Sequence, residues 1–250
     1  MKLKGKVAIV TGGARDIGRD VSIQLAKEGA RVVINYFSSE TEAQETKQSI
    51  TDAGGEAIAI KGDMTKWEDV QSLVEQTKKA FGNEIHLLVN VVGGLFGRKT
   101  IEEQDEAWFN LVMDVNVKSV FFTTKAVVGA MPPGSSIVNF SSQAGRDGGG
   151  GGASLYATAK GAVMTYTRAM AKELGPKGIR VNAVAPGMIA TSFHDRFTKP
   201  EIRTNVAAAT PLRRQGDAKD VADLVVYLAS DESSFITGTN VDINGGTYFS

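Results

Sequence analysis

VAIVTGGARDIG, at residues 7–18, is a short apolar run that ends in a glycine-rich turn. The apolar run predicts a buried strand, and the threonine and glycines that follow it predict a tight turn. Apolar residues at 17, 21, 25 and 26 then follow helical spacing until Gly29. A strand, a turn and a helix in this order open a βαβ unit, and the backbone N–H groups of such a turn attract a phosphate.

The rest of the chain alternates between short apolar runs and longer helical segments. Strands are predicted at 31–34, 57–60, 85–89, 136–140, 180–184 and 240–243, and helices at 40–53, 67–81, 106–128, 155–174 and 218–228. Strands separated by helices imply right-handed crossovers and a parallel sheet with helices on both faces. We therefore expect one α/β domain over residues 1–250, built on a Rossmann-like, doubly wound parallel sheet of about seven strands.

Two segments are predicted as loops. Residues 148–152 are five consecutive glycines, which either move freely or follow a surface closely. Residues 188–211 are long and mixed in composition, which suits a lid over a substrate site.

The composition excludes several classes of protein. Lys plus Arg and Asp plus Glu are both 28, so the net charge of zero gives no sign of a nucleic-acid or membrane-surface partner. Without cysteine there is no disulfide and no thiolate chemistry, and with only His86 and His194 no multi-histidine metal site is expected. No long apolar run or signal-peptide core is present, so we expect a soluble, cytoplasmic protein.

Tyr156 and Lys160 are the strongest candidates for chemistry. They are four residues apart on a predicted helix, so they lie on the same face. A nearby cation lowers the pKa of a phenol, and such a tyrosine can protonate a carbonyl oxygen that receives a hydride. Ser141 and Ser142 end a predicted strand, where a hydroxyl can bind that oxygen.

Taken together, these segments resemble the short-chain dehydrogenase/reductase family. Residues 11–18 resemble its TGxxxGxG turn, with Asp16 at the middle glycine, and residues 156–160 resemble its YxxxK motif. The resemblance implies that Ser142 is the catalytic serine, although it lies one residue further from the tyrosine than in the family. It also implies that Asn116 supports a water relay to the lysine. The implied catalytic set is Asn116, Ser142, Tyr156 and Lys160.

The resemblance also implies a dinucleotide site. Its residues would be Gly12, Arg15, Asp16, Ile17, Gly18, Tyr36, Asp63, Met64, Asn90, Gly93, Tyr156, Lys160, Pro186, Gly187 and Thr191. The last residue of the second strand, where NAD-binding folds carry an acid, is Tyr36, and no acid follows until Glu40. With Arg15 as a basic partner for a 2′-phosphate, this pattern favours NADPH/NADP.

Asp16 would repel the cofactor diphosphate. We therefore expect its carboxylate to cap the helix that starts near Ile17. We also expect it to pair with Arg15 or Arg19.

The substrate is less well defined. The body of the sequence resembles β-ketoacyl-acyl-carrier-protein reductases, whereas residues 93–99, 148–153 and 192–199 resemble bacterial reductases of 4-deoxy-L-erythro-5-hexoseulose uronate, an α-keto acid derived from alginate. A carboxylate on such a small molecule suits basic side chains. The expected substrate contacts are Ser142, Gln143, Arg98, Lys99 and His194.

Two alternatives remain open. One is a reductase of the same fold that acts on acyl thioesters, sugars or small ketones. The other is a non-catalytic dinucleotide sensor, which Asp16 and Val91 favour and the complete catalytic set disfavours. The resemblance and the apolar helix near 164–174 also suggest a homotetramer, which light scattering would distinguish from a 26.5 kDa monomer.

Overall fold

A single parallel sheet runs through the molecule. The computed structural model describes residues 1–249, without the side chain of Arg196. The strands are β1 (Val7–Thr11), β2 (Arg31–Tyr36), β3 (Glu56–Lys61), β4 (Leu87–Asn90), β5 (Ser136–Phe140), β6 (Arg180–Pro186) and β7 (Asn240–Ile243). They form one sheet in the order β3-β2-β1-β4-β5-β6-β7. This confirms the predicted doubly wound sheet. Ser250 lies outside the described residues.

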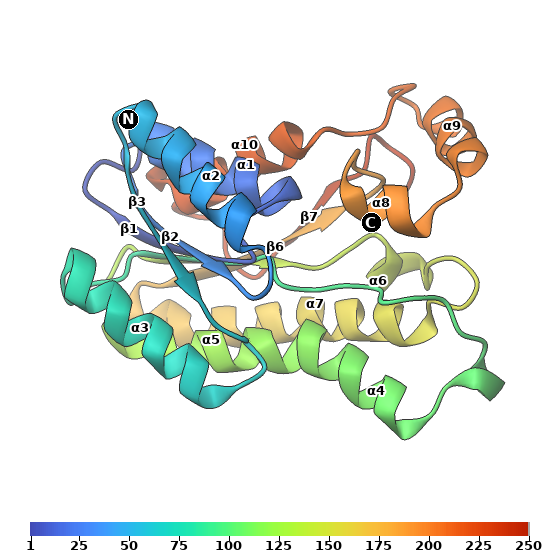
Figure 1. Cartoon of the computed structure of the whole chain (residues 1–250), viewed down its shortest axis with the longest axis horizontal. Coiled ribbons are helices and arrows are strands. Elements are labelled where there is room, and N and C mark those ends of the chain that lie inside the picture. Colours follow the sequence, from blue (N-terminus) through green and yellow to red (C-terminus); the bar gives the residue numbers. More distant parts are fainter. Residues whose placement is uncertain (250) are drawn as a thin grey trace.

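Helices cover both faces of the sheet (Figure 1). They are α1 (Asp16–Lys27), α2 (Glu40–Asp52), α3 (Trp67–Phe81), α4 (Glu106–Met113), α5 (Ser119–Val127), α6 (Ala144–Asp147), α7 (Ser154–Leu174), α8 (Ser192–Phe197), α9 (Pro200–Ala209) and α10 (Ala218–Ala229). Helices α1, α2 and α10 lie on one face, and α3, α5 and α7 lie on the other.

Successive side chains of each strand point to opposite faces of the sheet, so a hydrophobic core forms on both faces. In β1, Val10 packs in the core that contains Val21 of α1, whereas its neighbour Ile9 packs in the core that contains Leu73 of α3. Successive side chains of a strand point to opposite faces, so a strand buried on both faces is apolar throughout. The order of the strands reverses between β1 and β4. A ligand crevice is expected there, at the carboxyl ends of the strands.

Three segments differ from the sequence prediction. The helix predicted over 106–128 is interrupted by a π-helical turn, Asp114–Lys118, which buries Asn116 completely. The segment 188–211, predicted as a loop, contains α8 and α9. Pro200 occupies the first turn of α9, a favourable position that could have indicated this helix. The short helix α6 before the glycine run was also missed.

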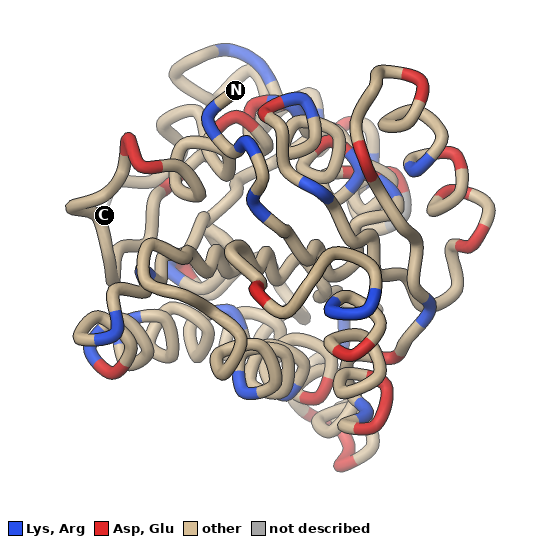
Figure 2. The backbone as a smooth tube through the Cα atoms, turned by 90° about the vertical axis from the view of Figure 1, so that its left-hand side faces the viewer, with Lys and Arg blue, Asp and Glu red and all other residues tan. Residues whose placement is uncertain are grey.

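Charge is dispersed over the surface. In the view of Figure 2, basic and acidic residues are interspersed along the chain rather than gathered by sign. None of the helices in the described part of the chain is long and apolar enough to cross a membrane. Within residues 1–249, no cluster of three or more acidic or histidine side chains is placed to hold a metal ion.

Candidate active site

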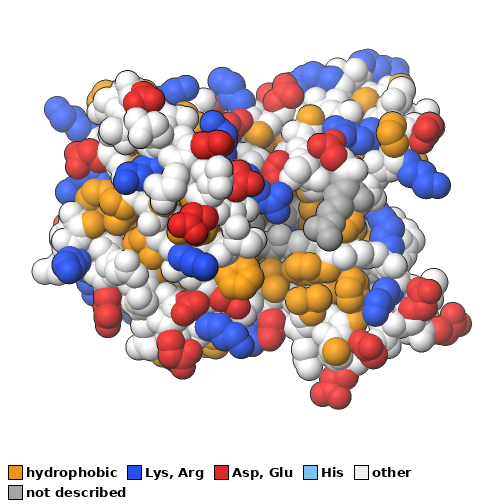
Figure 3. All heavy atoms as spheres, viewed as in Figure 1, with side chains coloured by type: hydrophobic (Ala, Val, Ile, Leu, Met, Phe, Trp, Pro, Cys, Tyr) orange, Lys and Arg blue, Asp and Glu red, His pale blue; other side chains and the backbone are white. Residues whose placement is uncertain are grey.

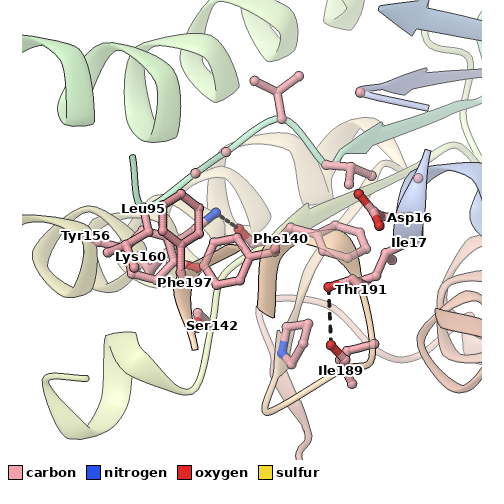
Figure 4. Close-up of a pocket in the computed structure, with 18 of the residues that line it drawn as sticks. Asp16, Ile17, Leu95, Phe140, Ser142, Tyr156, Lys160, Ile189, Thr191 and Phe197 are labelled. Atoms are coloured by element: carbon pink, nitrogen blue, oxygen red, sulfur yellow. Dashed lines mark hydrogen bonds between the residues drawn. The ribbon is translucent and has the colours of Figure 1, made fainter. Parts of the chain in front are cut away.

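A cavity of about 1000 Å³ opens at the carboxyl ends of the strands. This volume is at the upper end of the range for ligand sites. Its walls include Gly12, Arg15, Asp16, Ile17, Gly18, Tyr36, Asp63, Met64, Gly93, Tyr156, Lys160, Pro186, Gly187 and Thr191. These are the residues predicted to bind the dinucleotide, except Asn90. Figure 4 shows Asp16, Ile17 and Thr191 toward one end of the cavity and Ser142, Tyr156 and Lys160 toward the other.

The turn after β1 is shaped to approach a diphosphate. A Cβ atom on Gly18 would lie only 2.0 Å from the carbonyl oxygen of Gly12, so a side chain there would displace the backbone. Gly12 has a φ of +64°, which favours glycine. Its N–H donates to Oδ1 of Asn35, at 3.3 Å, and the N–H of Gly13 donates to the Asn35 carbonyl, at 3.0 Å. Such a turn at a helix N-terminus fits a dinucleotide.

Asn35 was missed by the sequence prediction. A polar residue inside the apolar run of β2 is the signal that could have revealed its role.

Asp16 does not cap α1, and that expectation was wrong. Arg15 is the N-cap residue, and no side chain caps the helix. Asp16 has a left-handed backbone, with a φ of +51°, and its carboxylate bonds to the lid instead of the first-turn N–H groups. The expected ion pair with Arg15 is present at 3.2 Å.

The catalytic candidates meet on one wall of the cavity. The hydroxyl of Ser142 lies close enough to that of Tyr156 to act on the pKa of the phenol. The Lys160 ammonium donates to the carbonyl of Phe140, at 2.9 Å, and lies 5.7 Å from the centre of the Tyr156 ring. Ser141, the alternative serine, is buried, and its hydroxyl donates to the carbonyl of Val184, at 2.8 Å, within the sheet. The geometry therefore favours Ser142 over Ser141.

Burial shifts the pKa values of this pair. It raises the pKa of the Tyr156 phenol, and the hydroxyl of Ser142 partly offsets this increase. It lowers the pKa of Lys160 to about 8. The pKa of Tyr156 is therefore raised and not lowered as expected, because the loss of hydration disfavours the charged form of the phenol.

The lowered pKa of Lys160 predicts a pH-dependent stability. Between pH 8 and 10.5 the unfolded chain binds a proton at this lysine that the folded chain has released, so its contribution to the free energy of unfolding increases with pH. The stability of the wild type relative to Lys160→Met should therefore improve by about 1–3 kcal/mol across that window. Urea denaturation of both proteins at several pH values measures this difference. A difference that stays flat with pH would contradict the shift.

Two asparagines lie behind the cavity wall. Asn116 accepts from the N–H of Gly94, at 3.0 Å, and donates to its carbonyl, at 2.9 Å. A Cβ on Gly93 would come within 2.7 Å of the Lys160 ammonium and 2.8 Å of Asn116, so all three crowd together. Asn90 donates to Asn139, at 2.9 Å, and accepts from Thr123, at 2.7 Å. Its polar atoms are used inside the core, so its support of a cofactor is indirect.

Aromatic residues of α8 lie near the wall that carries Tyr156. The ring of Phe193 lies 6.3 Å from that of Tyr156 and 5.2 Å from that of Phe197. Phe197 lines the same cavity as Tyr156 and Lys160 (Figure 4). In Figure 3, hydrophobic side chains gather in the hollow below α8 and α9. The sequence prediction missed these phenylalanines. Their spacing of four residues could have indicated a helix with both rings on one face.

Four of the five predicted substrate residues line the cavity: Ser142, Gln143, Arg98 and His194. Arg98 is exposed at the rim and donates to the carbonyl of Gly151, at 2.9 Å. His194 has its pKa lowered to about 4, mainly by burial and then by Arg203, with Arg98 contributing. Gln143 accepts from the hydroxyl of Thr247, at 3.0 Å.

Lys99, the fifth predicted substrate residue, does not line the cavity. Its ammonium lies 4.7 Å from the centre of the Trp108 ring, a cation–π contact.

Comparisons with known proteins agree with this geometry. The family model described as enoyl-(acyl carrier protein) reductase matches residues 12–248. The short-chain dehydrogenase/reductase of Serratia marcescens is 34% identical, with a TM-score of 0.93 over 98% of this chain and 99% of its own. The chain belongs to the short-chain dehydrogenase/reductase family. It is an oxidoreductase by membership of this family.

Two further relatives are informative. The 3-oxoacyl-acyl-carrier-protein reductase FabG of Haemophilus influenzae is 36% identical over 250 residues, which cover 99% of this chain and all of that protein. A blue fluorescent protein from a metagenomic library, solved in complex with NADPH, is 32% identical, with a TM-score of 0.93 over 100% of both chains. The relatives therefore include a reductase and a nicotinamide-binding protein.

Proposed function

We propose that this short-chain dehydrogenase/reductase uses NADPH to reduce a carbonyl group to an alcohol. The observation that carries the proposal is one cavity that holds both a phosphate-binding turn and the contact between Ser142 and Tyr156 beside Lys160. A non-catalytic sensor would not need this set.

The chain's own residues account for the handling of the proton. When bound, NADPH supplies a hydride to the carbonyl carbon. Ser142 holds the carbonyl oxygen by a hydrogen bond, and Tyr156 gives its phenolic proton to that oxygen. The ammonium of Lys160 favours the phenolate that remains. Asn116 fixes the backbone next to Lys160 and supports a route by which water restores the proton.

NADPH should be preferred over NADH. Residues 36–39, at the end of β2, line the cavity without a carboxylate that would repel a 2′-phosphate. Arg15 lies at the same end, and a charge-assisted contact contributes roughly 1.5–3 kcal/mol. Because its side chain is 59% exposed, we expect Arg15→Ala to reduce the NADPH/NADH ratio of kcat/KM by about 10-fold, mainly through KM. A wild type that uses NADH equally well would refute the preference.

For the substrate, we propose an α-keto acid such as 4-deoxy-L-erythro-5-hexoseulose uronate. Arg98 and His194 both line the cavity, and a guanidinium can bind a carboxylate at two points. Acyl thioesters, as the name of the Haemophilus relative indicates for that protein, are the second candidate. NADPH oxidation measured against a panel of keto acids, acyl thioesters and neutral ketones would decide between them.

Arg98→Ala should lower kcat/KM for the keto acid by about 10-fold, the modest effect expected of an exposed charge. The same substitution should lower kcat/KM for a neutral ketone of similar size by less than twofold. Lys99→Ala is the matched control, because its ammonium rests on Trp108 outside the cavity. Equal losses on charged and neutral substrates would remove Arg98 from the substrate site.

A homotetramer is also part of the proposal. Support comes from large hydrophobic side chains that this chain leaves exposed, among them Phe109, Phe121 and Phe235. Exposed apolar surface of this kind is typical of subunit interfaces.

A further inference from the structure

Asp16 joins two segments that are far apart in the sequence. Its carboxylate accepts a hydrogen bond from the N–H of Ser192, at 2.9 Å, and another from the hydroxyl of the same residue, at 2.6 Å. The guanidinium of Arg15 completes the cluster, with contacts of 3.2 Å to Asp16 and 2.8 Å to the Ser192 hydroxyl. Arg15 and Asp16 belong to the phosphate-binding turn, whereas Ser192 is the first residue of α8.

The contact with Ser192 depends on an aspartate at position 16, because it needs both a left-handed backbone and a carboxylate. Its φ of +51° lies in the left-handed region, which glycine, asparagine and aspartate tolerate better than other residues. A glycine, which the family turn carries at this position, would accept the same backbone but has no side chain to reach Ser192. The contact therefore comes from the substitution itself.

The helix that begins at Ser192 covers the catalytic wall. Its second residue, Phe193, lies 6.3 Å from the ring of Tyr156, and Phe197 packs against Phe193. Fixing the first residue of so short a helix limits the position of both rings. A substitution of Asp16 should therefore change the packing around Tyr156, although Asp16 belongs to the phosphate-binding turn.

We propose that Asp16 is a positioning residue that ties the lid to the phosphate-binding turn and holds Phe193 over Tyr156. This inference rests on the proposed function, since it assigns the cavity to a nicotinamide and a carbonyl substrate. The arrangement has a cost, because a carboxylate at the turn repels the diphosphate of the cofactor. Asp16 therefore lowers the affinity for the cofactor but keeps the lid ordered.

Two opposite effects separate this role from a purely structural one. Asp16→Gly should speed amide hydrogen exchange of residues 192–198 in the cofactor-free protein by about 5-fold or more, because the lid loses its attachment. The same variant should bind NADPH about 3- to 10-fold more tightly, as measured by titration of NADPH fluorescence, because a negative charge is gone. Its KM for the carbonyl substrate should rise while NADPH affinity improves.

Ser192→Ala and Asp20→Asn complete the experiment. Ser192→Ala removes only the hydroxyl partner, so it should loosen the lid without tightening NADPH binding. Asp20→Asn removes a carboxylate from the same helix, at a position outside the cavity lining, and should change neither property. Unchanged lid exchange in both Asp16→Gly and Ser192→Ala would overturn the proposal. So would faster exchange in Asp20→Asn equal to that in Asp16→Gly.

The exchange and binding measurements do not depend on turnover. If no carbonyl compound is reduced but the lid still loosens in Asp16→Gly, the proposed reaction fails and the attachment of the lid stands. If a carbonyl compound is reduced by NADPH but lid exchange is insensitive to Asp16, the opposite holds.

Discussion

Tyr156→Phe should lower kcat for NADPH-dependent carbonyl reduction by at least about 100-fold, the usual contribution of a positioned acid. The substitution keeps the ring that packs near Phe193 and removes only the hydroxyl that contacts Ser142. The ammonium of Lys160 donates to the carbonyl of Phe140.

Steady-state NADPH oxidation measures this loss. The dissociation constant of NADPH, from fluorescence titration, is the control and should change less than about twofold, because the phosphate-binding turn is untouched. Turnover near that of the wild type would remove Tyr156 as the proton donor. A parallel loss of NADPH binding would instead indicate damage to the cavity.

Gly18→Ala should weaken NADPH binding by about 100-fold or more. The added Cβ would lie 2.0 Å from the carbonyl oxygen of Gly12, and no rotamer can relieve a clash between Cβ and backbone. The turn would have to open, and the N-terminus of α1 would no longer be held in place to bind a diphosphate. Displacement of packed backbone also costs stability, about 1–3 kcal/mol for overpacking of this kind.

Gly129→Ala is the matched control, because a Cβ at that glycine meets no atom within 4 Å and φ there is not positive. Isothermal titration with NADPH and thermal unfolding of both variants test the prediction. Normal affinity in Gly18→Ala would show that the turn does not contact the cofactor. An equal fall in melting temperature for both variants would show that the effect is general to glycine replacement.

The sequence predicted the layers of the fold well because the signals are local. The helix predicted over 67–81 has those bounds in the structure, and every predicted strand is present. Prediction was weaker where backbone geometry depends on neighbours. The π-helical turn around Asn116 has no periodicity of its own that marks it. The helices within 188–211 were marked only by Pro200 and by the spacing of Phe193 and Phe197.

The candidate site was predicted in part. Tyr156 and Lys160 share a helix face by spacing alone, and Arg15 and Asp16 pair as adjacent residues. Lys99 shows the limit of such reasoning. It follows Arg98 directly in the sequence, yet its ammonium turns to Trp108 rather than to the cavity.

By itself, the sequence determined the parallel sheet, the phosphate-binding turn and the tyrosine–lysine pair, since each depends on residues within a few positions of one another. Tertiary structure alone decided that the hydroxyl of Ser141 bonds within the sheet whereas Ser142 acts on Tyr156, and that the carboxylate of Asp16 reaches Ser192. The reason is physical. The direction of a side chain at the end of a strand, and a contact between residues 176 positions apart in the sequence, are both set by the packing of distant segments. Such packing leaves no periodic pattern in the chain.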